Sequence, residues 1–213
     1  MKFLMVFAAT ALSAAPPMGW ICRDCDERRI RESATVIATN GMRAAGYIHI
    51  YAQGGAGLKN FLQSKGLRLA PSADTAPSLP KVEQQSVFTL LAMQAAPLIV
   101  DGDPREWSAE TRSIVLNREV IAVNQDPLGQ PGALLAKQGE IEIWTRALSG
   151  SRTAVALFNR GAESADVRVR WPDLGLNGKR RVRDVWAKRN LGPLAESFAG
   201  SLSPHGVVLL LID

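Results

Sequence analysis

The hydrophobic pattern of the chain changes near Gly132, and this change constrains the fold more than any other feature of the sequence. Before Gly132, apolar residues recur at helical spacing and alternate with short β-branched runs. After it, segments of alternating apolar and polar residues are separated by Gly, Ser, Asn and Pro turns. The stretch 126–132, DPLGQPG, interrupts both helices and ladders. The pattern therefore predicts an α/β part at residues 16–132 and an all-β part at 133–213.

The first part reads as helices and strands in alternation. Ile30, Ala34 and Ile37 share one face of an amphipathic helix, and Gly41 is placed to end it. Apolar residues cover the expected helix at 82–97 nearly all round, which predicts that it is buried. This alternation predicts a parallel α/β sheet. The expected helices are 26–40, 57–66, 82–97 and 108–123, and the expected strands are 45–52, 67–70 and 98–100.

The second part contains short strands in a pattern typical of an antiparallel β-sandwich. The segment 178–189, GKRRVRDVWAKR, holds much of the basic excess. Its basic residues are interrupted by Val182, Val185 and Trp186, which favours a solvated strand pair with the arginines pointing outward. The expected strands are 140–147, 153–160, 166–171, 180–186 and 206–212.

Composition and charge exclude several classes of function. Apolar residues make up 46% of the 213 residues, enough for a sizeable core. The net charge of +5 is not gathered into the long basic stripe with aromatic platforms that a nucleic-acid groove needs. Outside the N-terminus, no apolar run reaches the length of a membrane span. We expect no nucleic-acid partner and no membrane partner.

Two cysteines, Cys22 and Cys25, stand at C-x-x-C spacing. A zinc site needs about four ligands, and His49 and His205 are not at finger spacing from this pair. A redox pair, a metal ligand pair, incidental thiols or one local disulfide all remain open, with the last two favoured. The residues imply no cofactor and no metal.

Residues 1–15, MKFLMVFAATALSAA, have the layout of a short secretory signal, with Lys2, an apolar stretch and small residues near Ala15. A first strand or a non-native start explains them equally well, and Pro16 disfavours cleavage. A cleaved signal would place the protein outside the cytoplasm, secreted or periplasmic. Without one, we expect a cytoplasmic protein.

Seven short sequence motifs, in the order in which they occur, resemble those of the α-galactosidase and α-N-acetylgalactosaminidase family of retaining glycoside hydrolases. They are PPMGW at 16–20, IRESA with GMRAAGY at 30–47, SKGLRL at 64–69, AAPLI at 95–99, NREVIAVNQDPLG at 117–129, ALFNRG at 156–161 and PHGVVLL at 204–210. The resemblance implies a (β/α)₈ barrel followed by a C-terminal antiparallel β-sandwich. It also implies hydrolysis of terminal α-linked galactose by two aspartates, and an α-galactoside oligosaccharide as ligand.

The length of the first part does not accommodate that barrel. A (β/α)₈ barrel takes about 250 residues, and residues 16–132 supply less than half of them. The motifs present correspond to the first three strands and the last barrel elements. The family's nucleophile motif, Tyr-x-Lys-x-Asp, and its later acid/base aspartate have no counterpart in this sequence. The fold class expected is an incomplete (β/α)₈ barrel followed by a β-sandwich.

The family's sugar contacts are also replaced where they can be aligned. Ile21 follows Trp20 where the family continues toward a second tryptophan. Gln53 and Gly54 stand where the family has an Asp-Asp pair that binds galactose hydroxyls, and Ser72 stands in place of a pocket tyrosine. Each of these changes removes a group that would hold the sugar.

Three other carboxylates follow predicted strands and are weak catalytic candidates: Asp74, Asp101 and Asp103. Carboxylates at the carboxyl ends of barrel strands face the active site. Turn aspartates next to Gly or Pro also accept local N–H bonds, so a structural role is favoured for Asp103.

Two functional hypotheses follow. In the first, the chain is an α-galactosidase-like hydrolase by resemblance, inactive because the strands that carry both catalytic aspartates are absent. In the second, it is a non-catalytic remnant or a weak carbohydrate-binding or interaction module. An incomplete barrel also leaves open sheet edges, through which we expect self-association. The polar cluster 124–126 at the junction is expected to satisfy backbone groups rather than to form a site.

Overall fold

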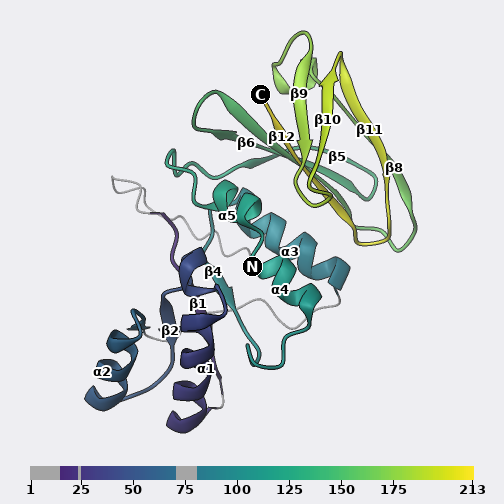
Figure 1. Cartoon of the computed structure of the whole chain (residues 1–213). Coiled ribbons are helices and arrows are strands. Elements are labelled where there is room, and N and C mark those ends of the chain that lie inside the picture. The colour runs from purple at the N-terminus through teal and green to yellow at the C-terminus, as the bar shows by residue number, and fades with distance from the viewer. Residues whose placement is uncertain (1–14, 24, 71–80) are drawn as a thin grey trace, which may run out of the picture.

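Alternating strands and helices build the first part of the chain (Figure 1). The structure, a computed structural model, describes residues 15–23, 25–70 and 81–213. The elements in chain order are β1 (Met18–Ile21), α1 (Glu27–Thr39), the 3₁₀ turn η1 (Arg43–Ala45), β2 (His49–Tyr51), α2 (Ala56–Ser64), β3 (Arg68–Ala70), α3 (Lys81–Met93), β4 (Leu98–Val100), α4 (Ala109–Val115) and α5 (Arg118–Asn124).

Helix α1 shows how local sequence sets these elements. The Asp26 side chain accepts a hydrogen bond from the Arg29 N–H at 2.7 Å, which satisfies one of the free N–H groups of the first turn. Ile30, Ala34 and Ile37 are buried, as the spacing predicts. Past the helix, Gly41 has a φ of 95°, a conformation that glycine adopts without strain.

The four strands form one parallel sheet in the order β3-β2-β1-β4. Gly19 of β1 is in register with His49 of β2, and Met18 is in register with Leu98 of β4. The last strand of this part therefore pairs directly with the first. Strands β3 and β4 stand at the two outer edges, and no strand in the described part of the chain pairs with either outer side.

The predicted single helix at 108–123 is wrong. Two helices, α4 and α5, occupy this region, separated at Leu116 and Asn117. The Asn117 side chain accepts hydrogen bonds from the N–H groups of Glu119 and Val120 at 3.1 and 3.3 Å, so it starts a new helix instead of continuing the old one. The Ser108 side chain caps α4 by accepting a hydrogen bond from the Thr111 N–H at 3.0 Å.

The second part of the chain is antiparallel. Its six-stranded sheet has the order β10-β9-β12-β7-β6-β5, and a two-stranded sheet pairs β11 with β8. The strands are β5 (Ala133–Gln138), β6 (Ile141–Leu148), β7 (Arg152–Asn159), β8 (Ala165–Arg170), β9 (Arg180–Asp184), β10 (Arg189–Leu194), β11 (Ser197–Leu202) and β12 (Val207–Ile212), with the 3₁₀ turn η2 (Pro172–Leu174) after β8. In the segment 178–189, where a strand pair was expected, β9 is the first strand, a turn follows at 185–188, and only Arg189 belongs to β10; Val182 is buried and Arg181 is exposed, as predicted.

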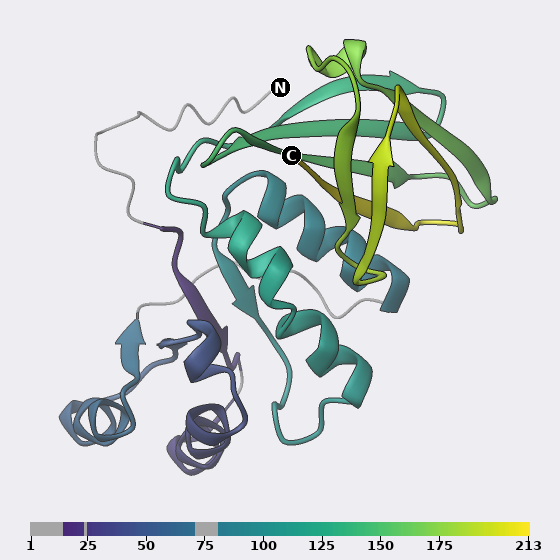
Figure 2. The same cartoon turned by 45° about the horizontal axis from the view of Figure 1, so that its top comes forward.

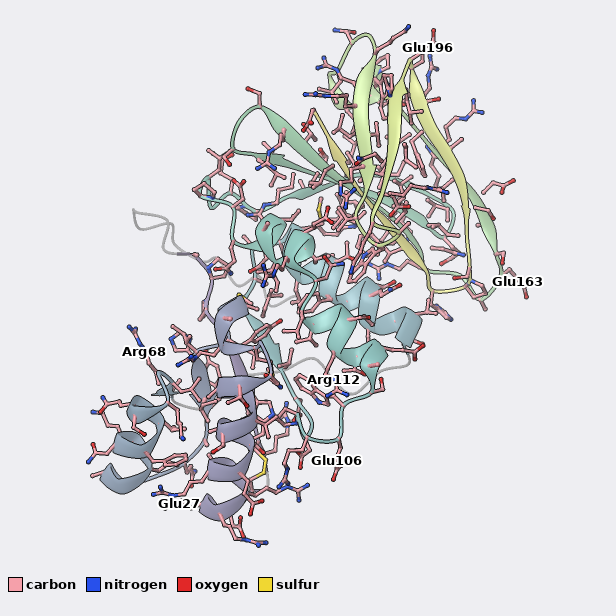
Figure 3. All side chains as sticks on the ribbon, in the orientation of Figure 1. Glu27, Arg68, Glu106, Arg112, Glu163 and Glu196 are labelled. Carbon is pink, nitrogen blue, oxygen red and sulfur yellow. A yellow bond between two sulfur atoms is a disulfide. The ribbon has the colours of Figure 1, made fainter. Side chains whose placement is uncertain are left out.

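Helices α3, α4 and α5 lie between the parallel sheet and the sandwich (Figure 2). One hydrophobic cluster joins Trp20 and Leu98 of the sheet, Met93 of α3, and Phe158 and Leu209 of the sandwich. A second cluster lies within the sandwich itself, around Trp171. Charged side chains such as Glu27, Arg68 and Glu163 point outward (Figure 3). The two parts therefore share a core, and the predicted division at residue 132 stays a prediction.

Candidate functional site

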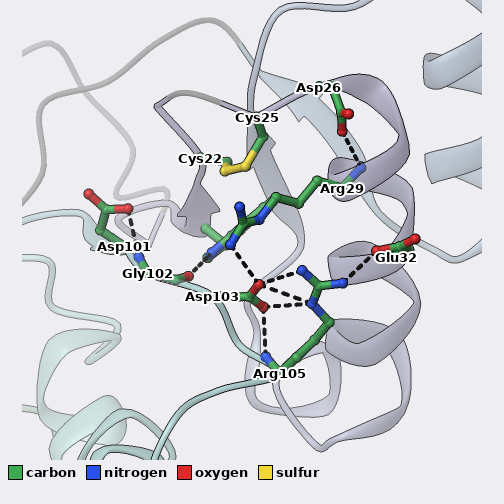
Figure 4. Close-up of polar contacts among 10 residues, drawn as sticks. Cys22, Cys25, Asp26, Arg29, Glu32, Asp101, Gly102, Asp103 and Arg105 are labelled. Carbon is green, nitrogen blue, oxygen red and sulfur yellow. Dashed lines mark hydrogen bonds and ion pairs between the residues drawn. A yellow bond between two sulfur atoms is a disulfide. The ribbon is translucent and has the colours of Figure 1, made fainter.

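The carboxyl edge of the parallel sheet is where the sequence places candidate site residues. All four strands end at this edge because all four are parallel. Cys22 follows β1, Gln53 lies two residues after β2, and Asp101 follows β4. Asp74 and Ser72 lie outside the described residues. The structure therefore brings Asp101 and Asp103 to the edge together with the Cys22–Cys25 turn (Figure 4).

Asp103 is the center of an ion-pair network. Its side chain is 6% exposed and accepts hydrogen bonds from the Arg105 guanidinium at 2.9 and 3.0 Å through Nε. Arg29 of α1 donates a further bond to Oδ2 at 3.3 Å. Arg105 also contacts Glu32 of α1. The network therefore fastens the loop after β4 to helix α1.

The Arg105 guanidinium sets the charge state of Asp103. Its hydrogen bonds lower the pKa of Asp103 to about 2, against the opposing effect of burial, and Arg29 adds to the lowering. Asp103 is therefore an anion at neutral pH and holds no proton to give to a leaving group. The structural role favoured for Asp103 agrees with these contacts.

Asp101 is more exposed and forms fewer contacts. Its carboxylate accepts from the Gly102 N–H at 2.6 Å and from Arg23 Nε at 3.2 Å. The Trp20 indole N–H donates to the Gly102 carbonyl at 2.7 Å, which ties this turn to β1. Gly102 has a φ of 84°, so the turn also depends on glycine at this position.

Cys22 and Cys25 form a disulfide, which was one of the alternatives the sequence left open. It closes the turn between β1 and α1, beside Arg29 (Figure 4). Within the described ranges, no group of three or more His, Cys, Asp or Glu side chains could hold a metal ion. In the same part of the chain, no helix is long and apolar enough to cross a membrane.

Comparisons with known proteins identify the same family as the seven sequence motifs. The Melibiase_C family, the alpha galactosidase C-terminal beta sandwich domain, matches residues 138–212. The Melibiase_2 family, alpha galactosidase A, matches residues 76–126. The chain belongs to the α-galactosidase family. The family resemblance is thus confirmed, over both the α/β part and the sandwich.

Among α-galactosidases, the Alpha-galactosidase 2 of Arabidopsis thaliana is 38% identical over 129 residues, which cover 60% of this chain and 33% of that protein. The chain thus spans about a third of the length of the curated relatives it matches. The crystal structure of alpha-galactosidase I from Mortierella vinacea matches with a TM-score of 0.83 and 15% identity, covering 93% of this chain and 96% of that one. A structure of the Saccharomyces cerevisiae enzyme with raffinose has a TM-score of 0.81 and 11% identity, covering 93% and 97%.

The fold class predicted for this α-galactosidase relative is confirmed, a partial parallel α/β region followed by an antiparallel β-sandwich. Strands β1, β2 and β3 correspond to the first three barrel strands by their sequence motifs, and β4 corresponds to the last. In a closed barrel the first and last strands are neighbours, and β1 pairs with β4 here. The strand order is therefore that of a barrel without its middle.

The polar cluster 124–126 contacts backbone groups, as predicted. Asn124 is fully buried and donates through Nδ2 to the carbonyls of Leu91 and Ala96 at 3.2 and 2.8 Å. Burial would raise the pKa of Asp126, but hydrogen bonds from Leu128 and Ser149 lower it on balance. The cluster therefore joins α5 to α3 and to the sandwich, and it is not a reactive site.

Sequence reasoning missed a cleft of about 590 Å³ between α5 and the sandwich. Arg183 of β9 donates from Nε and Nη2 to the two carboxylate oxygens of Glu119 in α5 across it, and this pairing lowers the pKa of Glu119. Further lining residues include Arg181, Asn190 and Asp213. Arg181 and Asp213 also pair, at 3.8 Å. Two ion pairs thus form within the lining, and Arg152, which also lines the cleft, pairs with Asp126 outside it. No sequence pattern could locate a cleft formed by residues so far apart along the chain.

Proposed function

We propose that this chain is a non-hydrolytic member of the α-galactosidase family. One observation carries the proposal. Strand β3 ends at Ala70 and helix α3 begins at Lys81, so ten residues separate them. Each strand–helix unit of a (β/α)₈ barrel takes about thirty residues, so the missing middle strands cannot fit in this interval. By family resemblance, those strands carry both catalytic aspartates.

The carboxylates described at the sheet edge do not replace them. A retaining hydrolysis needs two carboxyl groups about 5 to 5.5 Å apart, one acting as nucleophile and one protonated to assist the leaving group. Asp103 is bound by two guanidinium groups, and its pKa is too low for an acid at neutral pH. Asp101 is engaged by Arg23 and by its own turn.

α-Galactosides are the substrates to test, because the curated relatives are named α-galactosidases and one structural neighbour is recorded with raffinose. The alternative, a weak carbohydrate-binding module, would retain affinity for such sugars without turnover. The cleft beside α5 gives it little support, because aromatic stacking platforms are absent from its lining.

The experiment is release of nitrophenol from nitrophenyl α-galactoside, and of galactose from raffinose, by the purified full chain. The Arabidopsis relative assayed in parallel is the positive control, and circular dichroism verifies that this chain is folded. We expect no turnover above buffer. Turnover that is abolished by Asp74→Asn or Asp103→Asn would refute the proposal.

A further inference from the structure

The parallel sheet has two open edges of equal length. Strand β3 exposes one edge and β4 the other, and each has three residues. In the described part of the chain, neither outer side is paired. Unpaired N–H and C=O groups along a strand are a template for another strand.

The four strands amount to half of an eight-stranded ring. A closed parallel barrel of this class has eight strands, and the order β3-β2-β1-β4 supplies four consecutive ones. A two-fold rotation about an axis along the strands keeps their direction unchanged. It places β3 of each copy beside β4 of the other, so both new strand pairs are parallel and equivalent.

The two faces of the sheet bury different apolar clusters. Alternate residues Trp20, Ile50 and Leu98 pack on the face that the helices cover. Ile21, Tyr51 and Ile99 belong to a separate apolar cluster. Because successive side chains point to opposite faces, this second cluster lies on the face that a closed barrel turns inward. These three side chains are only 4 to 7% exposed in the single chain, so the strand edges, and not this cluster, carry the argument for closure.

Charges beside the two edges are complementary. In the closed ring, α2 next to β3 would lie beside the partner's α3, which leads into β4. Both helices begin at the carboxyl edge of the sheet. Lys59 is the fourth residue of α2 and is exposed, and Glu83 is the third residue of α3 and is half-buried. Each helix thus carries one of two opposite charges near its start.

We propose that two copies of this chain associate through their parallel sheets, β3 of each against β4 of the other, to close an eight-stranded barrel. This inference does not depend on the proposed lack of hydrolysis, since it follows from strand order and edge charge alone. The carboxyl edge of one copy is completed only by the strands of the second.

The test is the mass of the full chain in solution by analytical ultracentrifugation over a range of concentrations. We expect a dimer of twice the 23.0 kDa chain mass. A monomer at all concentrations, or an open series of higher oligomers, would overturn the proposal.

Charge-swap variants locate the interface. Lys59→Glu and Glu83→Lys each turn two symmetric attractions into repulsions, and we expect each to weaken dimerisation about tenfold. The double variant restores the opposite pairing, so its affinity should return to that of the original chain.

A matched control addresses the other exposed edge. Strand β5 ends the six-stranded sheet and carries Leu134, which is 46% exposed. Leu134→Lys should leave the dimer intact. Dissociation of the dimer by Leu134→Lys, or a dimer affinity that neither charge reversal changes, would assign the contact to another surface and refute the barrel closure.

Discussion

At the scale of single residues, the carboxylate of Asp103 carries the most information. The sequence indicated a structural role because Asp103 stands in a turn before Pro104. It did not identify Arg29 as a partner, because that residue lies 74 positions away and meets Asp103 only when α1 packs beside the β4 loop. Local turn chemistry was therefore predictable, and the network that buries the carboxylate was not.

Asp103 should make stability depend on pH. Its pKa is about 2 in the folded chain, below the usual 3.8, so its contribution is full above about pH 4 and is lost as pH falls through 2. The shift corresponds to roughly 2 kcal/mol at neutral pH. Asp103→Asn should lower the free energy of unfolding by that amount at neutral pH. It should also weaken the fall of this free energy with decreasing pH, measured by urea denaturation from pH 7 to pH 3.

Asp101→Asn is the matched control, because Asp101 is more exposed and meets a single guanidinium. It should cost less than about 1 kcal/mol. Equal losses for the two variants would contradict the network described around Asp103.

At the scale of elements, the sequence predicted helices better than strands. Apolar spacing located α1 and α2, because each packs one face on the core, and an apolar pattern nearly all round located α3, which lies between the parallel sheet and the sandwich. Strands β5, β10 and β11 escaped prediction: β5 is an edge strand with nearly all residues exposed, and β10 contains Gly192 and Pro193. Edge strands lack the alternation that burial imposes on inner strands.

The break between α4 and α5 is a testable element boundary. Asn117 is 4% exposed and its side chain satisfies two N–H groups at the start of α5. Asn117→Ala should destabilise the chain by about 1 kcal/mol, measured by urea denaturation. Asn117→Ser, which retains an acceptor oxygen, should recover most of the loss. No change with alanine would show that the cap does not fix the boundary.

At the scale of the whole molecule, the strand order explains both what the chain retains and what it lacks. The sandwich and α3 to α5 share a continuous core with the parallel sheet, so the fold retains the family's junction. The absence of the middle barrel strands was predictable from the sequence, because residues 16–132 are too few for a complete barrel and the ordered motifs match only its first and last elements. It could not predict the cleft beside α5, because that site exists only where β9 and α5 meet.

Covalent trapping tests the central claim most directly. A retaining α-galactosidase forms a covalent bond between its nucleophile and the sugar, so a mechanism-based epoxide analogue of α-galactose labels that carboxylate even where turnover is slow. Intact mass spectrometry of the incubated chain should show no added sugar, while the Arabidopsis relative is labelled under the same conditions. A stoichiometric adduct on Asp74, Asp101 or Asp103 would show that the chain has a working nucleophile and would contradict the account.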